Sequence, residues 1–190
     1  IRSIKENFFK SGIFFEPSKT NFRLLMANIY INKLEDKIKA YELALSDKKK
    51  ILKLALITRS NLGANRIFKK KDDKKNLITE NVKSDTLDSF TKQLSKKDTL
   101  IFMDVQGHES YVFKGAKRTI KKKIPLVFEF SPLLLDKNWI RNFDLLLKNY
   151  KFFYDLRDKN RRKKFNKDNL IALFNELKSR EINFTELMIV

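Results

Sequence analysis

A short polar segment follows an apolar one in the middle of the chain, where residues 101–120 read IFMDVQGHESYVFKGAKRTI. The polar residues are Asp104, Gln106, His108 and Glu109, and His108 is the only histidine in the protein. Carboxylates and imidazoles are the side chains that most often accept or donate protons in active sites. A histidine at the start of a helix is, however, more often a solvated cap. The segment therefore predicts a helix start that carries groups able to transfer protons.

Further acids stand where other apolar segments end. Glu16 follows the apolar residues 13–15, and Glu129 lies near the end of the apolar residues 124–130. In open α/β sheets, ligands bind beyond the carboxyl ends of the strands. There, Glu16 either accepts hydrogen bonds from the vicinal hydroxyls of a ribose or caps the helix that follows it. Gly107 has the conformational freedom to turn the chain sharply between its strand and its helix.

The elements that position these residues alternate along the chain. Apolar segments bounded by polar ones predict buried strands, and a period near 3.6 predicts helices. Expected strands cover residues 13–15, 38–44, 52–56, 77–83, 100–105, 124–130, 152–156 and 186–190, and expected helices cover residues 4–10, 21–34, 109–120, 139–147 and 169–177, with a short helix after Thr86. This alternation predicts an α/β fold with a Rossmann-like, doubly wound and mostly parallel sheet.

Length and composition exclude several classes of protein. The 190 residues are enough for one domain, 1–190, with a sizeable core. No apolar segment approaches the roughly 20 residues that cross a membrane. The chain has no cysteine, which excludes disulfides and thiolate metal sites and fits a reducing, cytoplasmic compartment. One histidine and scattered acids do not form a set of metal ligands, so no metal is expected.

The net charge of +19 raises the question of a nucleic-acid partner. Basic clusters lie at residues 48–50, 69–71, 74–75, 121–123 and 161–164, scattered between the expected elements. We therefore interpret the charge as a bias in composition and do not expect nucleic acid as a partner. Residues 69–75 read KKKDDKK and predict a solvated loop.

The segment IFMDVQGHESYVFKGA resembles the hallmark of the FkbM family of S-adenosylmethionine-dependent methyltransferases. In that family a strand ends in Asp-Val-Glu/Gln-Gly-x-Glu, and the next helix carries Leu/Phe-Lys-Gly-Ala. The matching positions here are Asp104, Val105, Gln106, Gly107, Glu109, Phe113, Lys114, Gly115 and Ala116. Weaker resemblances follow in the family's order, in FFEPSKTNFRLLMANIYIN, YELALSDKKK, VKSDTLDSF, IPLVFEFSP and NFTELMIV. Together they cover almost the whole chain.

The resemblance implies a sheet of the class I methyltransferase type, with S-adenosylmethionine as the cofactor. It implies that Glu16 binds the ribose of the cofactor and that Ala44 and Leu45 line its adenine. The implied acceptor is a hydroxyl group of a sugar, a glycan or another small molecule. Because a hydroxyl loses its proton as it attacks, Asp104 or His108 is the candidate base.

Two further acids are assigned to the acceptor. Glu129 is expected to contact the substrate, and Glu109 either positions the acceptor or caps its own helix. The alternative function is that of a catalytically inactive homologue or of a basic module that binds nucleic acid or another anion. Such a module would place exposed aromatic residues among its basic clusters. The aromatic residues here fall mostly at the apolar positions of expected helices and strands.

The chain departs from the family pattern at its start. The family begins with a strand and an Asp-x-Gly-Ala-Asn-x-Gly loop that approaches the methionine part of the cofactor, and neither is found in this sequence. Because the sequence opens at Ile1, inside the helix expected after that loop, we interpret it as N-terminally incomplete. The strand that is lacking would lie between the strands at 13–15 and 100–105. A family member that has lost cofactor binding is the other interpretation.

Overall fold

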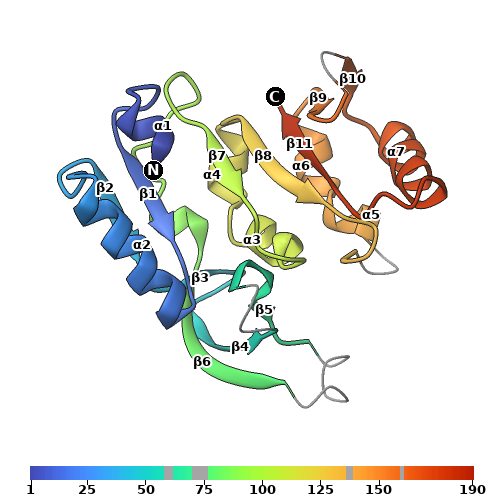
Figure 1. The fold of residues 1–190 in the computed structure, drawn as a ribbon. Coiled ribbons are helices and arrows are strands. Elements are labelled where there is room, and N and C mark those ends of the chain that lie inside the picture. The colour runs from blue at the N-terminus through green and yellow to red at the C-terminus, as the bar shows by residue number, and fades with distance from the viewer. Residues whose placement is uncertain (58–61, 70–76, 136–138, 159–160) are drawn as a thin grey trace. The chain divides into compact units, whose positions relative to one another are not determined.

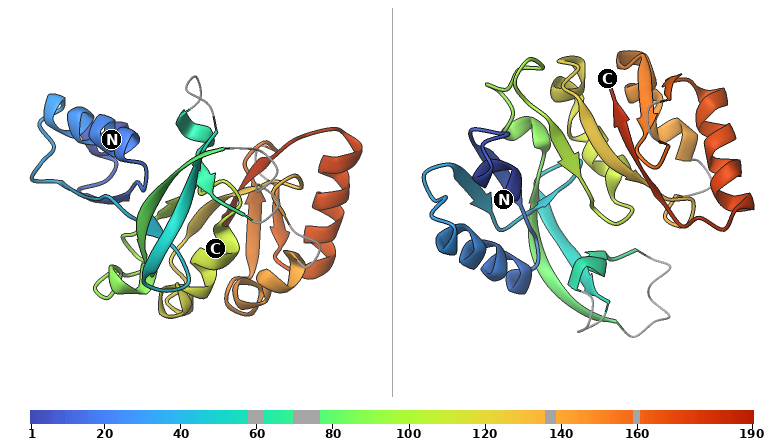
Figure 2. Two further views of the ribbon diagram at one scale, coloured as in Figure 1. Left: turned by 90° about the horizontal axis from the view of Figure 1, so that it is seen from below. Right: turned by 45° about the horizontal axis from the view of Figure 1, so that its top comes forward.

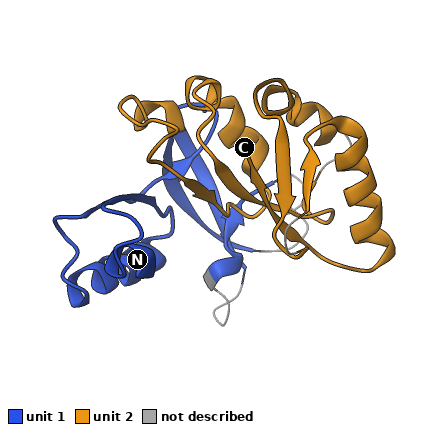
Figure 3. Cartoon of the chain, turned by 90° about the horizontal axis from the view of Figure 1, so that it is seen from above, with its two compact units in different colours: residues 1–85 blue, residues 86–190 orange. Residues whose placement is uncertain are grey.

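The computed structural model describes residues 1–57, 62–69, 77–135, 139–158 and 161–190. These residues form two compact units, Ile1–Asp85 and Thr86–Val190, which Figure 3 shows in different colours. Among the described strands, unit 1 contains two hydrogen-bonded sheets and unit 2 contains one. Of the predicted loop at 69–75, all but Lys69 lies outside the described residues.

Unit 1 begins with a pair of parallel strands. Strand β1 (Gly12–Phe15) pairs with β2 (Ile38–Tyr41), and helix α2 (Lys19–Ile31) connects them (Figure 1). Parallel neighbours need such a crossover because the chain has to return to the same end of the sheet. The buried core of this part consists of Ile4, Ile29, Leu34 and Ile38.

The first expected helix is shorter than the sequence pattern predicts. Helix α1 covers Arg2–Lys5, whereas the pattern predicted a helix over residues 4–10. Asn7 adopts a left-handed conformation with a φ of 62°, which cannot continue a right-handed helix. Asparagine tolerates this conformation better than most residues, so the helix ends before it.

A four-stranded sheet completes unit 1. Its order is β3 (Ala44–Leu45), β6 (Ile78–Asp85), β4 (Lys50–Leu56) and β5 (Arg66–Ile67), with a 3₁₀ turn η1 (Leu62–Ala64) before β5. Figure 2 shows β4 and β6 as a long antiparallel pair. The strand expected at 38–44 is divided into β2 and β3, because the chain turns where the Leu43 N–H donates to the Tyr41 carbonyl. Strand β5 was not predicted, since two residues are too few to show alternation.

The sheet of unit 2 contains the candidate catalytic segment. Its strand order is β10 (Arg162–Lys164), β9 (Phe152–Asp155), β11 (Thr185–Ile189), β8 (Leu126–Phe130) and β7 (Ile101–Met103). Strands β7 and β8 are parallel, and β11 is antiparallel to both β8 and β9. Strands β7, β8 and β9 therefore share one direction, with β11 inserted against it. The mixed α/β fold is confirmed, but the described strands do not form the single, mostly parallel sheet that was expected.

The helices of unit 2 differ in length from those expected: the helix predicted at 169–177 is longer, whereas the helices predicted at 109–120 and 139–147 are each divided in two. They are η3 (Leu87–Ser89, a 3₁₀ turn), α3 (Glu109–Lys114), α4 (Lys117–Lys121), α5 (Trp139–Asn142), α6 (Asp144–Asn149) and α7 (Lys167–Ser179). The continuous helix predicted at 109–120 is broken between α3 and α4. Gly115 ends α3 and Ala116 leaves the helical conformation, with a φ of −119°. Glycine has a low helix propensity, so a break at this position costs little.

Aromatic side chains fill the core of unit 2. Phe128 on β8 lies between Phe113 of α3 and Phe143 at the start of α6, with ring centroids 5.6 and 5.7 Å away. The opposite side of β7 is more open than the sequence predicted. Phe102 is 64% exposed, although the apolar pattern of residues 100–105 predicted burial on both faces. Only Met103 of β7 is fully buried.

A carboxylate from η3 holds the start of α4. Asp88 accepts hydrogen bonds from the backbone N–H groups of Arg118 (2.9 Å) and Thr119 (2.8 Å), and from the Thr119 hydroxyl (2.7 Å). Burial favours the neutral acid, but these hydrogen bonds outweigh it and lower the pKa of Asp88. The stabilisation is therefore complete above the ordinary value of 3.8 and is lost as the pH falls through the lowered folded value.

Asp88→Ala is expected to lower the free energy of unfolding of unit 2 by about 2–3 kcal/mol, because it leaves the donors of α4 without an acceptor. Denaturation followed by the fluorescence of Trp139, the only tryptophan, measures this loss. Asp98→Ala is the control, since Asp98 is exposed and its carboxylate bonds with the neighbouring Ser95 and Thr99. Equal losses in the two variants would contradict the role given to Asp88.

Candidate active site

Three strands of unit 2 place carboxylates in one row. Met103 of β7 lies opposite Phe128 of β8, so Asp104, the next residue, lies beside Glu129. Glu186 of β11 is paired directly with Glu129. Because side chains alternate between the two faces of a sheet, the three carboxylates project from the same face. The row lies where the chain leaves β7 and β8, at their carboxyl ends.

Asp104 and Glu129 are joined by hydrogen bonds. The side-chain amide of Gln106 donates to Asp104 Oδ1 (2.7 Å) and to Glu129 Oε2 (3.3 Å). A further hydrogen bond links the carboxyl groups of Asp104 and Glu129, which requires a proton on one of them. Asp104 is exposed and Glu129 is partly buried, so these acids lie at the surface of the unit and outside its core.

The surroundings of Glu129 favour its neutral form. Burial is the largest cause, followed by the negative charges of Asp104 and Glu109, the hydrogen bond with Asp104 and the charge of Glu186. In that hydrogen bond the protonated Glu129 carboxyl donates to Asp104, and together these effects raise the pKa of Glu129 from 4.5 to about 7. A carboxyl group with this pKa is partly ionised at neutral pH, and it can therefore both accept and return a proton in that range.

The raised pKa of Glu129 has a consequence for stability. A folded-state pKa above the unfolded one means that the native protein binds more protons between pH 4.5 and about 7, so its stability falls as the pH rises through this window. Glu129→Gln removes this titration. We expect the free energy of unfolding of the variant to exceed that of wild type by about 1–3 kcal/mol between pH 4.5 and 8. This value is smaller than the full effect of the pKa shift, because solvent screens the half-exposed group.

Denaturation of wild type and Glu129→Gln at several pH values measures this difference. Glu181→Gln, on an exposed residue, is the matched control and should show no such trend. A constant difference between Glu129→Gln and wild type at all pH values would show that Glu129 titrates near its ordinary value.

His108 and Glu109 lie at the start of α3 and are both buried, at 4% and 7% exposure. The His108 ring stacks on Tyr111, with centroids 4.6 Å apart and planes 7° apart. Glu109 Oε1 accepts a hydrogen bond from the Gly107 N–H at 3.1 Å. Glu109 thus closes the turn before its own helix, and it also acts electrostatically on Glu129. The expected roles of His108 as a base and of Glu109 as a helix cap or toward an acceptor stay predictions.

The predicted cofactor residues belong to unit 1. Glu16 follows β1, and its Oε1 accepts a hydrogen bond from the backbone N–H of Ser18 at 2.8 Å, where α2 begins. Burial raises the pKa of Glu16, and the charge of Glu80 adds to the rise. Glu16 thus bonds to the residue that precedes α2, and its expected roles as a cap of that helix or toward a ribose stay predictions. Ala44 is buried and Leu45 is partly exposed, both on β3 beside β6.

One buried atom of Glu80, whose charge acts on Glu16, fits a ligand that carries hydroxyl groups. Among the described residues, Oε1 of Glu80 is a buried side-chain oxygen without a hydrogen-bond partner. A buried acceptor of this kind is costly unless a donor reaches it. The vicinal hydroxyls of a ribose are donors of the required type, so the acids of unit 1 fit the adenosine part of the predicted cofactor.

Two residues of the site were not assigned a role from the sequence. Gln106 belonged to the quoted motif, and its position between Asp104 and a glycine was the available signal. Glu186 could not be found in this way, because its pairing with Glu129 depends on β11 inserting beside β8. Strand order of that kind is not visible in local periodicity.

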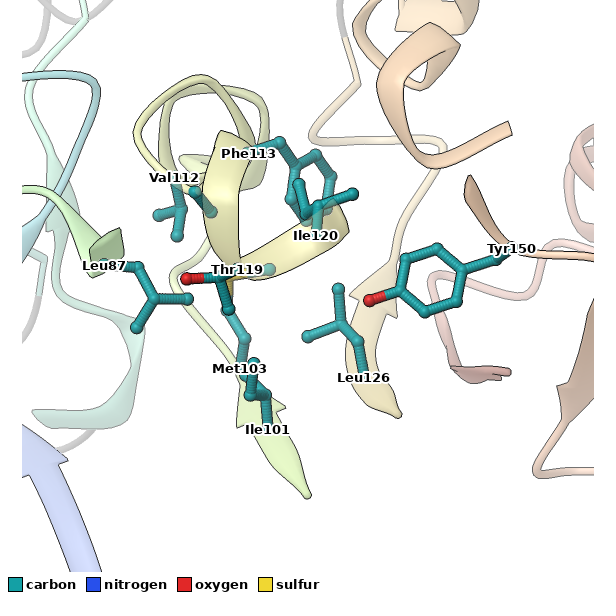
Figure 4. A pocket seen from close by; sticks show the side chains of 10 residues that line it. Leu87, Ile101, Met103, Val112, Phe113, Thr119, Ile120, Leu126 and Tyr150 are labelled. Atoms are coloured by element: carbon teal, nitrogen blue, oxygen red, sulfur yellow. The ribbon is translucent and has the colours of Figure 1, made fainter. Parts of the chain in front are cut away.

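A small hollow in unit 2 lies apart from the acids. Figure 4 shows it between β7, β8, α3 and α4, and it is lined by Leu87, Ile101, Met103, Val112, Phe113, Ala116, Thr119, Ile120, Leu126 and Tyr150. This lining is almost entirely apolar, so the hollow belongs to the core and does not suit a charged ligand.

Neither a metal-binding cluster nor a membrane-spanning helix is found among the described residues. Within them, no group of three or more His, Cys, Asp or Glu side chains is arranged to hold a metal ion. The helices described in the structure are each too short or too polar to cross a membrane.

Comparison with known proteins identifies the family. The model of the methyltransferase FkbM domain matches residues 4–166, and no curated protein matches the sequence. A crystal structure of methyltransferase FkbM from Methylobacillus flagellatus KT is similar with a TM-score of 0.48 and 15% sequence identity. That match covers 96% of this chain and 37% of the other, so the chain spans little more than a third of that protein's length. Because the family model covers most of the residues, the chain belongs to the FkbM methyltransferase family.

Proposed function

We propose that the chain takes part in S-adenosylmethionine-dependent O-methylation of a sugar, a glycan or another small molecule with a hydroxyl group. The observation that carries this proposal is the hydrogen-bonded pair of Asp104 and Glu129 at the ends of β7 and β8. A hydroxyl must lose a proton to become a methyl ether, and this pair can receive it. Family membership supports the reaction class and the methyl donor.

When bound, S-adenosylmethionine would supply an electrophilic methyl group on a sulfonium sulfur, with S-adenosylhomocysteine as the leaving group. The protein's part is to align the acceptor and to take its proton. Glu16, Ala44 and Leu45 are the residues proposed to hold the ribose and adenine. The Glu80 side-chain oxygen without a hydrogen-bond partner supports this assignment, since the charge of Glu80 acts on Glu16.

Asp104 and His108 were the two candidate bases, and the geometry favours Asp104 acting with Glu129. Asp104 is exposed and hydrogen-bonded to a carboxyl group that titrates near neutral pH. The His108 ring is buried against Tyr111, where an acceptor would have less access to it. In this assignment Glu129 contacts the acceptor because it takes up the proton that the acceptor hydroxyl loses. The negative charge of Glu109 makes Glu129 more basic.

We also propose that the two units belong to one class I methyltransferase domain. The family model supports this, because it runs from residue 4 to residue 166 and so crosses the boundary between the units. The shared direction of β7, β8 and β9, with β11 inserted against it, is typical of that class.

The test uses the purified full-length protein and S-adenosylmethionine labelled in its methyl group. Methyl glucoside, a neutral sugar, is the first acceptor, followed by oligosaccharides and phenols. We expect label in a product that withstands alkali, as methyl ethers do and methyl esters do not. Label only in an ester or an amine, or no transfer to any of these acceptors, would refute O-methylation of a small molecule.

A further inference from the structure

We propose that Gln106 is a positioning residue that holds Asp104 and Glu129 together as one proton-accepting pair. The inference rests on the proposed function, to which it adds a residue that carries no proton itself. Its basis is the geometry of the Gln106 side chain and of the backbone that presents it.

The amide nitrogen of Gln106 lies between two acids. It donates to Asp104 Oδ1 at 2.7 Å and to Glu129 Oε2 at 3.3 Å, and an amide has two N–H bonds, one for each acceptor. The shorter hydrogen bond holds the Gln106 amide against Asp104. The longer hydrogen bond connects the segment after β7 to Glu129 on β8. Gln106 thereby fixes the orientation of both carboxyl groups toward the row that they share with Glu186.

The backbone at Gln106 is unusual for its residue type. Its φ is 50°, and Gly107 after it has a φ of 88°. A left-handed residue other than glycine or asparagine costs roughly 1–2 kcal/mol, and such residues are concentrated at functional sites. The two left-handed residues turn the chain back, so that the Gln106 side chain returns over the end of the strand it has just left.

The charges around Glu129 explain why a neutral hydrogen-bond donor between Asp104 and Glu129 stabilises the pair. The charged groups that raise the pKa of Glu129 are Asp104 after β7, Glu109 on α3 and Glu186 on β11, and all three are acids. Their repulsion drives the carboxylates apart when the pair loses its shared proton. An amide N–H donated to each carboxylate opposes that repulsion and favours the ionised form. Gln106 thus keeps the pair assembled in the state that accepts a proton.

Two substitutions at Gln106 distinguish the effect of its side-chain donors from the effect of its left-handed backbone. Gln106→Leu removes both N–H donors and keeps the bulk, whereas Gln106→Gly removes them and also relieves the left-handed conformation. Gln93→Leu is the matched control, because Gln93 is exposed and lies before β7. The melting temperature should fall slightly in Gln106→Leu and should not fall in Gln106→Gly.

The decisive measurement is the titration of Glu129 by NMR, in protein labelled with carbon-13 at its carboxyl groups. Neither the methyl donor nor the methyl acceptor is added. In both Gln106 variants the midpoint should rise by about 0.5–1 pH unit, a three- to tenfold change in proton affinity. Gln93→Leu should titrate like wild type. Midpoints equal to wild type in the Gln106 variants would overturn the inference, whether or not the protein transfers methyl groups.

A kinetic readout tests the positioning itself. With methyl glucoside as acceptor, both Gln106 variants should form S-adenosylhomocysteine at least tenfold more slowly at saturation, with an unchanged KM for S-adenosylmethionine. A shifted titration with unchanged kcat would also overturn the inference. A wild-type protein without transfer to any acceptor would instead refute the proposed function, and the NMR titration would still decide whether Gln106 controls the pair.

Discussion

Asp104→Asn is expected to slow methyl transfer by about two orders of magnitude or more. The substitution keeps the shape of the side chain but removes the charge and the ability to accept a proton. It also removes the charge next to Glu129, so the pKa of Glu129 should fall toward its usual range. Because Asp104 is exposed, the melting temperature should change little.

Turnover, cofactor affinity and melting temperature measured together distinguish the roles that Asp104 can have. The control is Asp98→Asn, since Asp98 lies before the amino end of β7 and Asp104 lies after its carboxyl end. Unchanged turnover in Asp104→Asn would remove Asp104 from the mechanism. A large loss of melting temperature would make its role structural.

Phe128→Ala is expected to lower the free energy of unfolding of unit 2 by about 3–5 kcal/mol. Phe128 is completely buried and packs against Phe113 and Phe143. Its removal leaves a cavity under the strand that presents Glu129, so the acid row should lose its alignment along with the stability. Chemical denaturation followed by Trp139 fluorescence measures the loss, because Trp139 stacks on Phe174 within the same unit.

The matched control is Phe184→Ala, on a side chain that is 54% exposed at the start of β11. Phe184→Ala is expected to lower the free energy of unfolding by less than about 1 kcal/mol, since a surface substitution leaves no cavity. A loss in Phe128→Ala no greater than in Phe184→Ala would mean that the aromatic core contributes little to unit 2.

The sequence predicted the parts of this site that depend on local order. Asp104 was expected at the end of an apolar strand, and β7 does end immediately before it. Glu129 was expected near the end of the next strand, and it lies on β8. The alternation of apolar and polar segments was sufficient for both, since it marks where a strand leaves the core.

Other features depend on contacts between distant segments. The row of Asp104, Glu129 and Glu186 requires β11 to lie beside β8, and local periodicity does not determine which strands are neighbours. The break between α3 and α4 depends on the backbone at Gly115 and Ala116, inside a pattern that reads as one helix. The division of the 38–44 segment into β2 and β3 likewise follows from pairing with different partners.

The pH dependence of kcat/KM for methyl transfer tests the central claim most directly. If the Asp104 and Glu129 pair accepts the acceptor's proton, the rate should rise with pH to a plateau, with a midpoint near the pKa of about 7 at Glu129. This step should disappear in Glu129→Gln, which also lowers the rate. A wild-type profile without a step near pH 7, or the same midpoint retained in Glu129→Gln, would contradict the assignment of these carboxylates as the base.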